Sequence, residues 1–486
     1  MNLRDIAPYS PFDRGPAKLN IPSVFGASPN KPVLYSIPAT GQRPIHYEFE
    51  GNIPPGLQLD SESGIITGCV EEEGDYRVRV KVCNGLGIDE KNVCISIKKN
   101  GVGLTPLMGW SSWNAYARFV TQDDIMETAN LLVKTGLSSF GYRYVNLDSS
   151  WQGEYGGKYN AIMPNGRFPD IRGMCRHIHS LGLKAGIYST PMQKAWGGGE
   201  YFGCTTGKMD DKYTNTYYGI GTEHREQNNV NQWADWEFDY LKYDWWPCDT
   251  ENAETMRKCL SESKRDFMYC ITTGAEMKYA DYWKQNCNSW RDTGDSADTW
   301  EAVKKNLFTC DEWAQHCCPG HFYDLDMLET GYIFNQDIND FRASTLTENE
   351  QLTAFSIRIM FPSPIQISCD LRRLTDFDLA MLCNDEILAV NQDALGIGAV
   401  CVSQYIRHDL SNREIAHTKI YMRPLEDGSY AVGMFNLGDA EEEMCLALRK
   451  AFAVRDLWAK KEVGRNIEQL KFPVPPHGVR ILKLYS

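Results

Sequence analysis

Long hydrophobic runs are missing from this sequence. No stretch approaches the roughly 20 consecutive apolar residues that a membrane-spanning helix needs, and residues 1–8 lack the apolar core of a secretory leader. We therefore expect no membrane partner. The expected location is the cytoplasm if the chain is complete, and the periplasm or the outside of the cell if a leader has been removed.

Positive charge is scarce. Lys and Arg number 50 against 64 Asp and Glu, which gives a formal net charge of -14, and no segment is polybasic. Nucleic acids and anionic membranes bind basic surfaces, so this charge argues against both as partners. An uncharged substrate fits the composition better.

Several cofactor and nucleophile motifs are also absent. The glycine pairs Gly101-x-Gly103 and Gly219-x-Gly221 are incomplete as nucleotide fingerprints, and neither leads from a strand into a helix at the required spacing. The sequence contains no Gly-x-Ser-x-Gly elbow and no His-Glu-x-x-His. We expect a protein that works without a cofactor and without a metal ion.

Cysteines are numerous, at 16, but no two of them form a Cys-x-x-Cys pair. The densest cluster consists of Cys310, His316, Cys317, Cys318 and His321. Its spacing matches no standard zinc finger or ribbon, so buried thiols or a disulfide explain it better than a zinc site does.

The chain changes its hydrophobic rhythm at two places. A strand period of two runs from about residue 24 to residue 99, most clearly in Tyr76–Val82, and strand patterns return beyond residue 396, ending with Val479–Leu484. We predict an immunoglobulin-like β-sandwich over residues 1–100 and an antiparallel β-sandwich over residues 399–486.

Between these two parts, short apolar runs alternate with helical patterns. This alternation is typical of an α/β protein with a (β/α)₈ TIM barrel, which we predict over residues 104–398. Thr347–Glu350 has the pattern of a capping box and predicts the start of the helix before the last strand. The eight expected strands lie at residues 107–113, 142–148, 183–188, 240–244, 267–271, 289–292, 323–327 and 364–368.

Acidic residues stand at the ends of several of these strands, where (β/α)₈ barrels place their chemistry. Asp244 ends the run Tyr240–Asp244, and Asp295 closes the segment Ser289–Asp295. One carboxylate that attacks and one that transfers a proton are what cleavage of a glycosidic bond requires. Any single acid is more often a salt-bridge partner, but several on strand ends favour a glycosidase. The expected rim consists of Trp110, Asp148, Tyr188, Lys242, Asp244, Arg291, Asp295, Asp326 and Ser368.

Two cations accompany the acids. Lys242 lies two residues before Asp244, so both side chains point to the same side of the strand and the cation can keep the carboxylate ionised. Arg291 shares a short segment with Asp295 and can orient that acid or a sugar hydroxyl. The adjacent pair Trp245–Trp246 fits a sugar platform and core packing about equally well.

Seven segments match a known pattern in order and spacing. They are Thr105–Trp113, Gly182–Tyr188, Leu241–Asp244, Trp290–Asp295, Pro319–Leu328, Asp370–Arg372 and Val390–Gly396. On these segments the chain resembles glycoside hydrolase family 27, the α-galactosidases and α-N-acetylgalactosaminidases. The N-terminal module resembles the immunoglobulin-like domain that precedes some bacterial members.

The resemblance implies a retaining double displacement on a glycoside or oligosaccharide. Asp244 would form a covalent glycosyl-enzyme, and Asp295 would act first as acid and then as base. Trp110 and Tyr188 would line the pocket. The residues implied to hold the sugar or to lie near it are Trp110, Asp148, Ser149, Tyr188, Lys242, Arg291, Asp326, Met327 and Ser368.

One position departs from the family pattern. Members typically carry a second Asp after the one that matches Asp148, and the pair grips O4 and O6 of galactose, whereas this chain has Ser149. A hydroxyl lacks the charge-assisted part of such a bond, a difference of about 1 to 2 kcal/mol. α-D-Galactosides remain the first expectation. The alternatives are α-N-acetylgalactosaminides, β-L-arabinopyranosides, which lack the exocyclic CH₂OH, and a carbohydrate-binding barrel without activity, which the presence of both acids disfavours.

Overall fold

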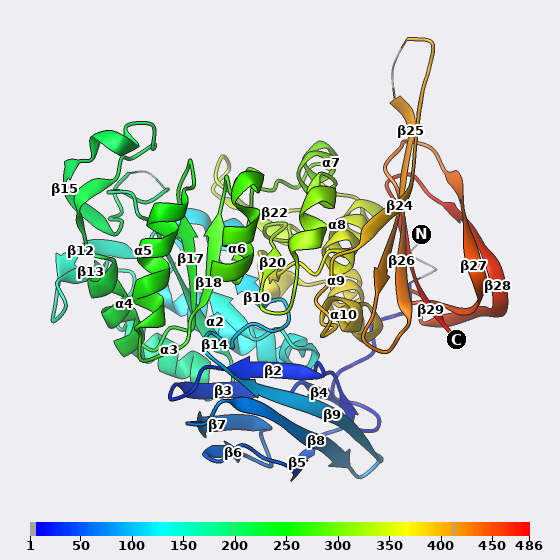
Figure 1. Cartoon of the computed structure of the whole chain (residues 1–486), viewed down its shortest axis with the longest axis horizontal. Coiled ribbons are helices and arrows are strands. Elements are labelled where there is room, and N and C mark those ends of the chain that lie inside the picture. Colours follow the sequence, from blue (N-terminus) through cyan, green and yellow to red (C-terminus); the bar gives the residue numbers. More distant parts are fainter. Residues whose placement is uncertain (1–5, 198, 412–413) are drawn as a thin grey trace.

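The N-terminal part of the chain is a two-layer β-sandwich (Figure 1). The computed structural model describes residues 6–197, 199–411 and 414–486, so residues 1–5 of the expected first domain and Gly198 lie outside it. In β8 (Gly74–Asn84), Tyr76, Val78 and Val80 point into the core, while Arg77 and Arg79 are exposed, which confirms the expected period of two. The other strands of the two sheets are β2 (Val24–Ala27), β9 (Gly87–Ile97), β5 (His46–Gly51), β3 (Pro32–Ser36), β7 (Ile65–Cys69) and β6 (Leu57–Leu59).

A parallel eight-stranded sheet follows and curls into a barrel. Each of the eight expected strands is present, and neighbours in the chain pair as in a TIM barrel. Leu328, just after the seventh strand, pairs in parallel with Ile367 of the eighth and closes the ring. In chain order the strands are β10 (Met108–Ser111), β11 (Tyr144–Asn146), β14 (Lys184–Ser189), β17 (Tyr240–Asp244), β18 (Met268–Thr272), β19 (Ser289–Trp290), β20 (Phe322–Tyr323) and β23 (Ile365–Ile367).

Helices cover the outside of the barrel, and their starts follow from the sequence. Thr347 and Glu350 form the expected capping box of α8 (Glu348–Met360). This helix is buried on all faces because it lies between the barrel and the C-terminal sheet, where the indole of Trp458 donates to Ser356. The other helices are α1 (Trp113–Tyr116), α2 (Gln122–Lys134), α3 (Ile171–Ser180), α4 (Glu226–Asp235), α5 (Thr250–Ser261), α6 (Ala280–Asn286), α7 (Trp300–Leu307), α9 (Asp376–Leu382) and α10 (Asp385–Asn391).

Three hairpins in the loops of the barrel were not predicted. Their strands have only four or five residues each, and several are rich in Gly and polar residues, so the strand signal is short or weak. They consist of β12 (Gln152–Gly156) with β13 (Ala161–Pro164), β15 (Thr205–Met209) with β16 (Gly221–His224), and β21 (Tyr332–Asn335) with β22 (Asp340–Ala343).

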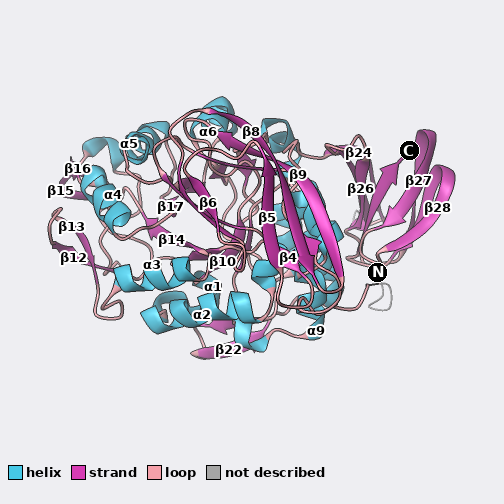
Figure 2. Ribbon diagram, turned by 90° about the horizontal axis from the view of Figure 1, so that it is seen from below, coloured by secondary structure: helices cyan, strands magenta, loops and turns pink. Residues whose placement is uncertain are grey.

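The N-terminal sandwich lies across one end of the barrel, as the view from below shows (Figure 2). Its Ser28 amide donates to Asp266 at 2.7 Å, and the guanidinium of Arg143 lies 4.1 Å from the centre of the Tyr35 ring. Asp266 and Arg143 directly precede barrel strands. The sandwich therefore covers the N-terminal ends of the strands and leaves their C-terminal ends open.

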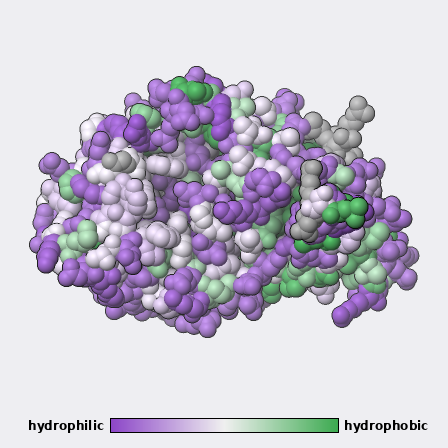
Figure 3. Space-filling view, turned by 90° about the horizontal axis from the view of Figure 1, so that it is seen from above, coloured by the Kyte–Doolittle hydropathy of each residue, from purple (hydrophilic) through white to green (hydrophobic). Residues whose placement is uncertain are grey.

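The C-terminal part is an antiparallel sandwich of six strands, five of which form its own hydrophobic core. β24 and β25 extend beyond the other strands as a ribbon (Figure 1), and Figure 3 shows strongly hydrophobic side chains gathered where this ribbon points at the viewer. Val402, Tyr405 and Leu410 are among its exposed apolar residues. The six strands are β24 (Val400–His408), β25 (Glu414–Pro424), β26 (Tyr430–Asn436), β29 (Val479–Tyr485), β27 (Glu442–Asp456) and β28 (Lys461–Val474).

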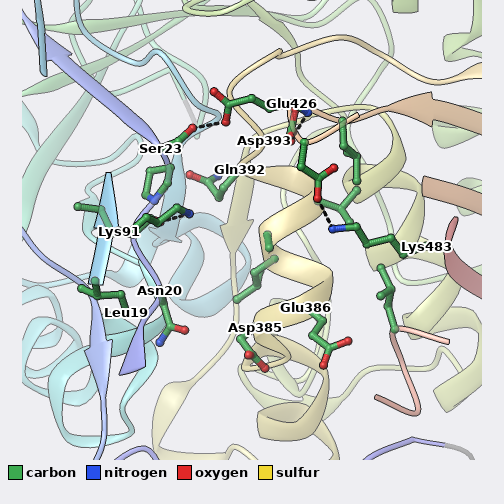
Figure 4. Close-up of a pocket in the computed structure, with 18 of the residues that line it drawn as sticks. Leu19, Asn20, Ser23, Lys91, Asp385, Glu386, Gln392, Asp393, Glu426 and Lys483 are labelled. Atoms are coloured by element: carbon green, nitrogen blue, oxygen red, sulfur yellow. Dashed lines mark hydrogen bonds and ion pairs between the residues drawn. The ribbon is translucent and has the colours of Figure 1, made fainter. Parts of the chain in front are cut away.

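The three parts meet at a cavity of about 580 Å³ (Figure 4). Two of its acids are engaged in ion pairs between the parts. Asp385 of α10 binds Lys18 of the first sandwich and Lys460 of the last, and Glu386 binds Arg455 at 2.7 Å. Such compensated charges are typical of an interface.

The cysteine cluster consists of thiols. Cys310 and Cys317 are buried and contact the backbone carbonyls of Leu307 and Trp313. Among the described residues, no group of His, Cys, Asp and Glu side chains is arranged to hold a metal ion, and no helix is long and apolar enough to cross a membrane.

Candidate active site

A cavity of about 410 Å³ opens at the C-terminal ends of the barrel strands, on the side away from the N-terminal sandwich. Both expected acids, Asp244 and Asp295, line it. The remaining lining residues are Trp113, Asp148, Ser149, Tyr188, Trp196, Gly197, Lys242, Trp246, Thr273 and Met327.

Asp244 is the last residue of β17 and is only 9% exposed. The parallel register places Thr272 of β18 directly beside it, and the Thr272 hydroxyl donates to Oδ1. The Tyr188 hydroxyl, from β14 on the other side, donates to Oδ2 at 2.9 Å. Burial raises the pKa of Asp244 above its ordinary value, while the charge of Lys242 and the bond from Thr272 oppose this rise.

Lys242 lies on the same face of β17, as the strand period requires, but its direct partner is Asp148. Its ammonium donates to Oδ2 of Asp148 at 2.7 Å. Burial alone would lower the pKa of Lys242, but the charges of Asp148, Asp244 and Asp326 outweigh burial and raise it. Lys242 is therefore a fixed cation between the carboxylates at the ends of β11 and β17.

Asp295 lies in the loop after β19, and its side chain is 77% exposed at the mouth of the cavity. The strand ends at Trp290, earlier than expected, and the next residue, Arg291, donates from Nη2 to Oδ1 of Asp295 at 2.9 Å. Arg291 is 2% exposed and also donates from Nη1 to Asp326 at 2.9 Å. A buried guanidinium thus ties the loop that carries Asp295 to the barrel wall.

Asp326 also holds the loop that carries Asp295. Its Oδ2 accepts the Ser296 amide at 2.7 Å in addition to Arg291. Burial would raise the pKa of Asp326, but Arg291 and Lys242 outweigh it and hold the pKa below its ordinary value. Asp326 does not line the cavity, so it can position Asp295 through Arg291 and Ser296.

Ser149 lines the cavity beside Asp148. Its hydroxyl donates to the backbone carbonyl of Trp196, and its amide donates to Oδ1 of Asp148 at 2.7 Å. The hydroxyl proton is therefore used within the protein, and the Ser149 oxygen can only accept a hydrogen bond from a ligand.

Four residues that were expected in the pocket do not line it, namely Trp110, Arg291, Asp326 and Ser368. Trp110 does not line it, because its side chain is fully buried in the barrel and donates to the Cys369 carbonyl at 2.8 Å. Trp113, beyond the end of β10, lines the cavity instead. Ser368 is also fully buried, and its hydroxyl donates to the Ser111 carbonyl at 2.9 Å, which joins the first and last strands.

The sequence did not predict several other residues of the site. Thr272 contacts Asp244, and Thr273, Trp196 and Gly197 line the cavity, but none of them is acidic or ends an expected strand. A register assignment between β17 and β18 would have found Thr272, because it is the direct neighbour of Asp244. No local sequence pattern indicates that Trp196 lines the cavity.

The two carboxyl groups have contrasting surroundings on one cavity. Asp244 is buried between two hydroxyl donors, whereas Asp295 is open to solvent and held by one guanidinium. Paired carboxyl groups in different environments can divide nucleophilic and proton-transfer roles between them. The site therefore contains the two carboxyl groups that cleavage of an acetal bond requires.

Comparison with known proteins identifies the family. A profile described as alpha galactosidase A matches residues 105–393, and one described as an alpha galactosidase C-terminal beta sandwich domain matches residues 416–484. A third, described as "Putative Ig domain", matches residues 15–97. The chain is 30% identical over 406 residues to alpha-galactosidase 2 of Arabidopsis thaliana, and the match covers 80% of this chain and 91% of the plant protein.

Solved structures agree with these matches. A protein of Bacteroides fragilis described as "putative alpha-galactosidase/melibiase" superposes with a TM-score of 0.85 at 28% identity, covering 98% of this chain and 99% of that chain. A family 27 β-L-arabinopyranosidase of Geobacillus stearothermophilus gives a TM-score of 0.67 at 26% identity, covering 79% and 96%. Since one profile alone matches more than half of its residues, the chain belongs to the alpha-galactosidase family of glycoside hydrolases, family 27.

Proposed function

We propose that the protein is a retaining exo-glycosidase that removes terminal α-D-galactosyl residues by a double displacement. The observation that carries this proposal is the pair Asp244 and Asp295 on one cavity, the first buried and the second exposed. The cavity of about 410 Å³ has the buried residues Asp148, Ser149 and Tyr188 in its lining, which suits the binding of a single terminal sugar.

In the first step Asp244 attacks the anomeric carbon and forms an ester to the sugar. Asp295 gives its proton to the glycosidic oxygen, so the bond to the leaving group breaks without release of an alkoxide. The hydroxyls of Tyr188 and Thr272 hold the attacking carboxylate in place.

In the second step the ionised Asp295 takes a proton from water, and the resulting hydroxide attacks the anomeric carbon. The ester to Asp244 breaks and its carboxylate is restored. Two inversions leave the anomeric configuration unchanged. Asp295 is open to solvent at the mouth, where both the leaving group and the incoming water must pass.

Asp148 and Lys242 supply the polar floor that binds the sugar hydroxyls. Asp148 and Lys242 form an ion pair at 2.7 Å and both line the cavity. Asp148 can still accept hydrogen bonds from a ligand, and Lys242 can still donate them. Arg291 and Asp326 act one layer behind, by positioning Asp295.

The raised pKa of Asp244 predicts the acid side of the pH profile. Asp244 must be ionised to attack, so kcat/KM falls as the pH drops through the pKa of Asp244. We expect this acid limb of the pH profile to lie above a pH of about 4, the ordinary pKa of Asp. Lys242→Met removes a charge that lowers the pKa of Asp244 and should move the limb to higher pH.

The measurement is kcat/KM against pH on an aryl α-galactoside. Lys81→Met, at a partly exposed lysine of the N-terminal sandwich, is the control and should leave the limb in place. A limb at or below pH of about 4 in the wild type, or one that does not move in Lys242→Met, contradicts this assignment.

Ser149 favours β-L-arabinopyranoside hydrolysis as a second candidate function. Its hydroxyl donates to the Trp196 carbonyl, so no charged acceptor for the exocyclic CH₂OH of galactose stands at this position. A pentopyranose lacks that group and loses nothing there. The similarity to the arabinopyranosidase of Geobacillus stearothermophilus, at 26% identity, supports the same candidate.

A panel of aryl glycosides tests both functions. It contains the α-D-galactoside, the α-N-acetylgalactosaminide, the β-L-arabinopyranoside and the α-D-glucoside, assayed with the wild type and with Ser149→Asp. We expect the substitution to raise the ratio of kcat/KM for galactoside over arabinopyranoside by about 5- to 30-fold, because a carboxylate adds about 1 to 2 kcal/mol per bond. An unchanged ratio shows that Ser149 does not select the sugar, and no turnover of any member by the wild type overturns the proposed activity.

A further inference from the structure

Tryptophan side chains converge on the mouth of the cavity from three separate segments of the chain, the start of α1 and two loops. Trp113 follows β10, Trp196 lies between β14 and β15, and Trp246 follows β17. In the described chain five tryptophans are not buried, and these three are among them. A single exposed aromatic side chain is ordinary, but three that line one opening form a surface built for contact.

Trp246 is the exposed member of an adjacent pair. Trp245 is fully buried and donates to Asp249 at 3.1 Å, whereas Trp246 is 53% exposed. The indole of Trp246 rests against Gly274, where a Cβ would come within 3.2 Å of its Cδ1. The local backbone therefore supports the ring at the rim and leaves one face toward the opening.

Trp196 begins an aromatic group that continues outward. Its ring lies 4.7 Å from that of Tyr217, centre to centre, at an angle of 34°, and Tyr218 contacts both rings edge on. Tyr217 is 67% exposed. Because the Trp196 carbonyl accepts the Ser149 hydroxyl, this group is tied to the floor of the cavity at one end and reaches solvent at the other.

The leaving group must occupy this rim. Asp295, which delivers the proton to the glycosidic oxygen, is exposed at the same mouth as the indoles of Trp196 and Trp246. The lining of the cavity contains no Leu, Ile, Val or Phe among the described residues. A lipid chain would need such a continuous aliphatic wall, whereas separate flat rings between polar groups suit a flat, polar-edged ligand.

We infer that Trp196 and Trp246, extended by Tyr217, bind a pyranose unit of the leaving group, so that the substrate is an oligosaccharide. This inference rests on the proposed glycosidase function. A pyranose presents a face of C–H groups that packs on an indole, while its hydroxyls at the edge stay hydrated or reach Asp295 and Thr273. The aromatic surface thus selects what is attached to the terminal sugar, and the floor selects the terminal sugar itself.

The test compares two kinds of substrate in matched variants. α-Galactosyl fluoride carries no sugar in its leaving group, whereas α-galactosyl disaccharides do, and octyl α-galactoside carries a lipid-like chain. For Trp246→Ala we expect the loss of kcat/KM on the disaccharides to exceed the loss on the fluoride by about tenfold, mainly through KM. Trp246→Phe should restore most of it, and Tyr217→Ala should show a smaller effect of about threefold. Tyr405→Ala, an exposed aromatic of the C-terminal ribbon, is the control.

Each outcome of this test either supports or overturns the inference. Equal losses on fluoride and disaccharide in Trp246→Ala mean that the indole only supports the fold, and overturn the inference. A wild type that cleaves the fluoride but no disaccharide, or a variant whose loss is largest on the octyl glycoside, overturns it as well. A wild type that cleaves neither the fluoride nor any glycoside refutes the proposed function instead, so the two failures are distinguishable.

Discussion

Replacing Asp244 by Asn lowers kcat on an aryl α-galactoside by about 10⁴-fold or more, because the amide cannot form the ester that carries the sugar. The substitution keeps the size of the side chain and removes a buried charge, so we expect the variant to fold. Its thermal unfolding and its binding of the product sugar check this. Asp337→Asn, an exposed residue of the β21–β22 turn, is the control and should retain activity.

Azide separates loss of the nucleophile from general damage. In Asp244→Gly the small anion can enter the space that the carboxylate leaves between Tyr188 and Thr272 and attack the anomeric carbon of an activated substrate. One displacement then yields the β-glycosyl azide, the inverted product, while Asp295 still protonates the leaving group. Wild-type-like turnover by Asp244→Asn, or an azide product of retained configuration in Asp244→Gly, would refute the role of Asp244.

Replacing Asp295 by Gly has an effect that depends on the leaving group. With a sugar leaving group we expect kcat/KM to fall by about 10³- to 10⁴-fold, since the departing oxygen needs a proton. With a dinitrophenyl leaving group the first step should change little, because that phenolate leaves unprotonated. The slow second step then makes the glycosyl-enzyme accumulate, which a burst of phenolate and the mass of the intact protein would detect.

The same variant gives the opposite stereochemical result with azide. Here azide attacks the glycosyl ester at Asp244 in place of activated water and yields the α-glycosyl azide, with retained configuration. Arg291→Lys, which keeps the charge but not the fork that holds Asp295 and Asp326, should show a weaker form of the same dependence. Equal losses for sugar and dinitrophenyl leaving groups would contradict the assignment of Asp295.

Most of the barrel could be predicted from the chain because its strands and helices follow local rules. The eight apolar runs are buried on both sides, as parallel strands are, and Thr347 with Glu350 closes the capping box that begins α8. Asp244, Lys242 and Asp148 stand at or just after strand ends, so their place on the cavity also followed from strand period and fold class.

The sequence did not predict positions that depend on tertiary structure and not on local pattern. Trp110 and Trp113 belong to the same segment, Thr105–Trp113, and the sequence pattern does not show which of them lines the cavity. This depends on the residue at which β10 ends. Ser368 ends a strand region as expected, but the closing of the ring turns its hydroxyl onto Ser111. Trp196 lies between β14 and β15, outside any helix or strand, so no local pattern assigned it to the mouth.

By itself the sequence determined the fold class, the acid pair and the departure at Ser149, because these depend on residue identity and on spacing along a strand. Only the tertiary structure decided the partners. It pairs Lys242 with Asp148 more closely than with Asp244, and it joins both Asp295 and Asp326 to Arg291. It also directs the Ser149 hydroxyl to the Trp196 carbonyl. The physical reason is that hydrogen bonds and close ion pairs form only at about 3 Å. Which groups come that close depends on how the strands pair and the loops return, and no local pattern encodes this.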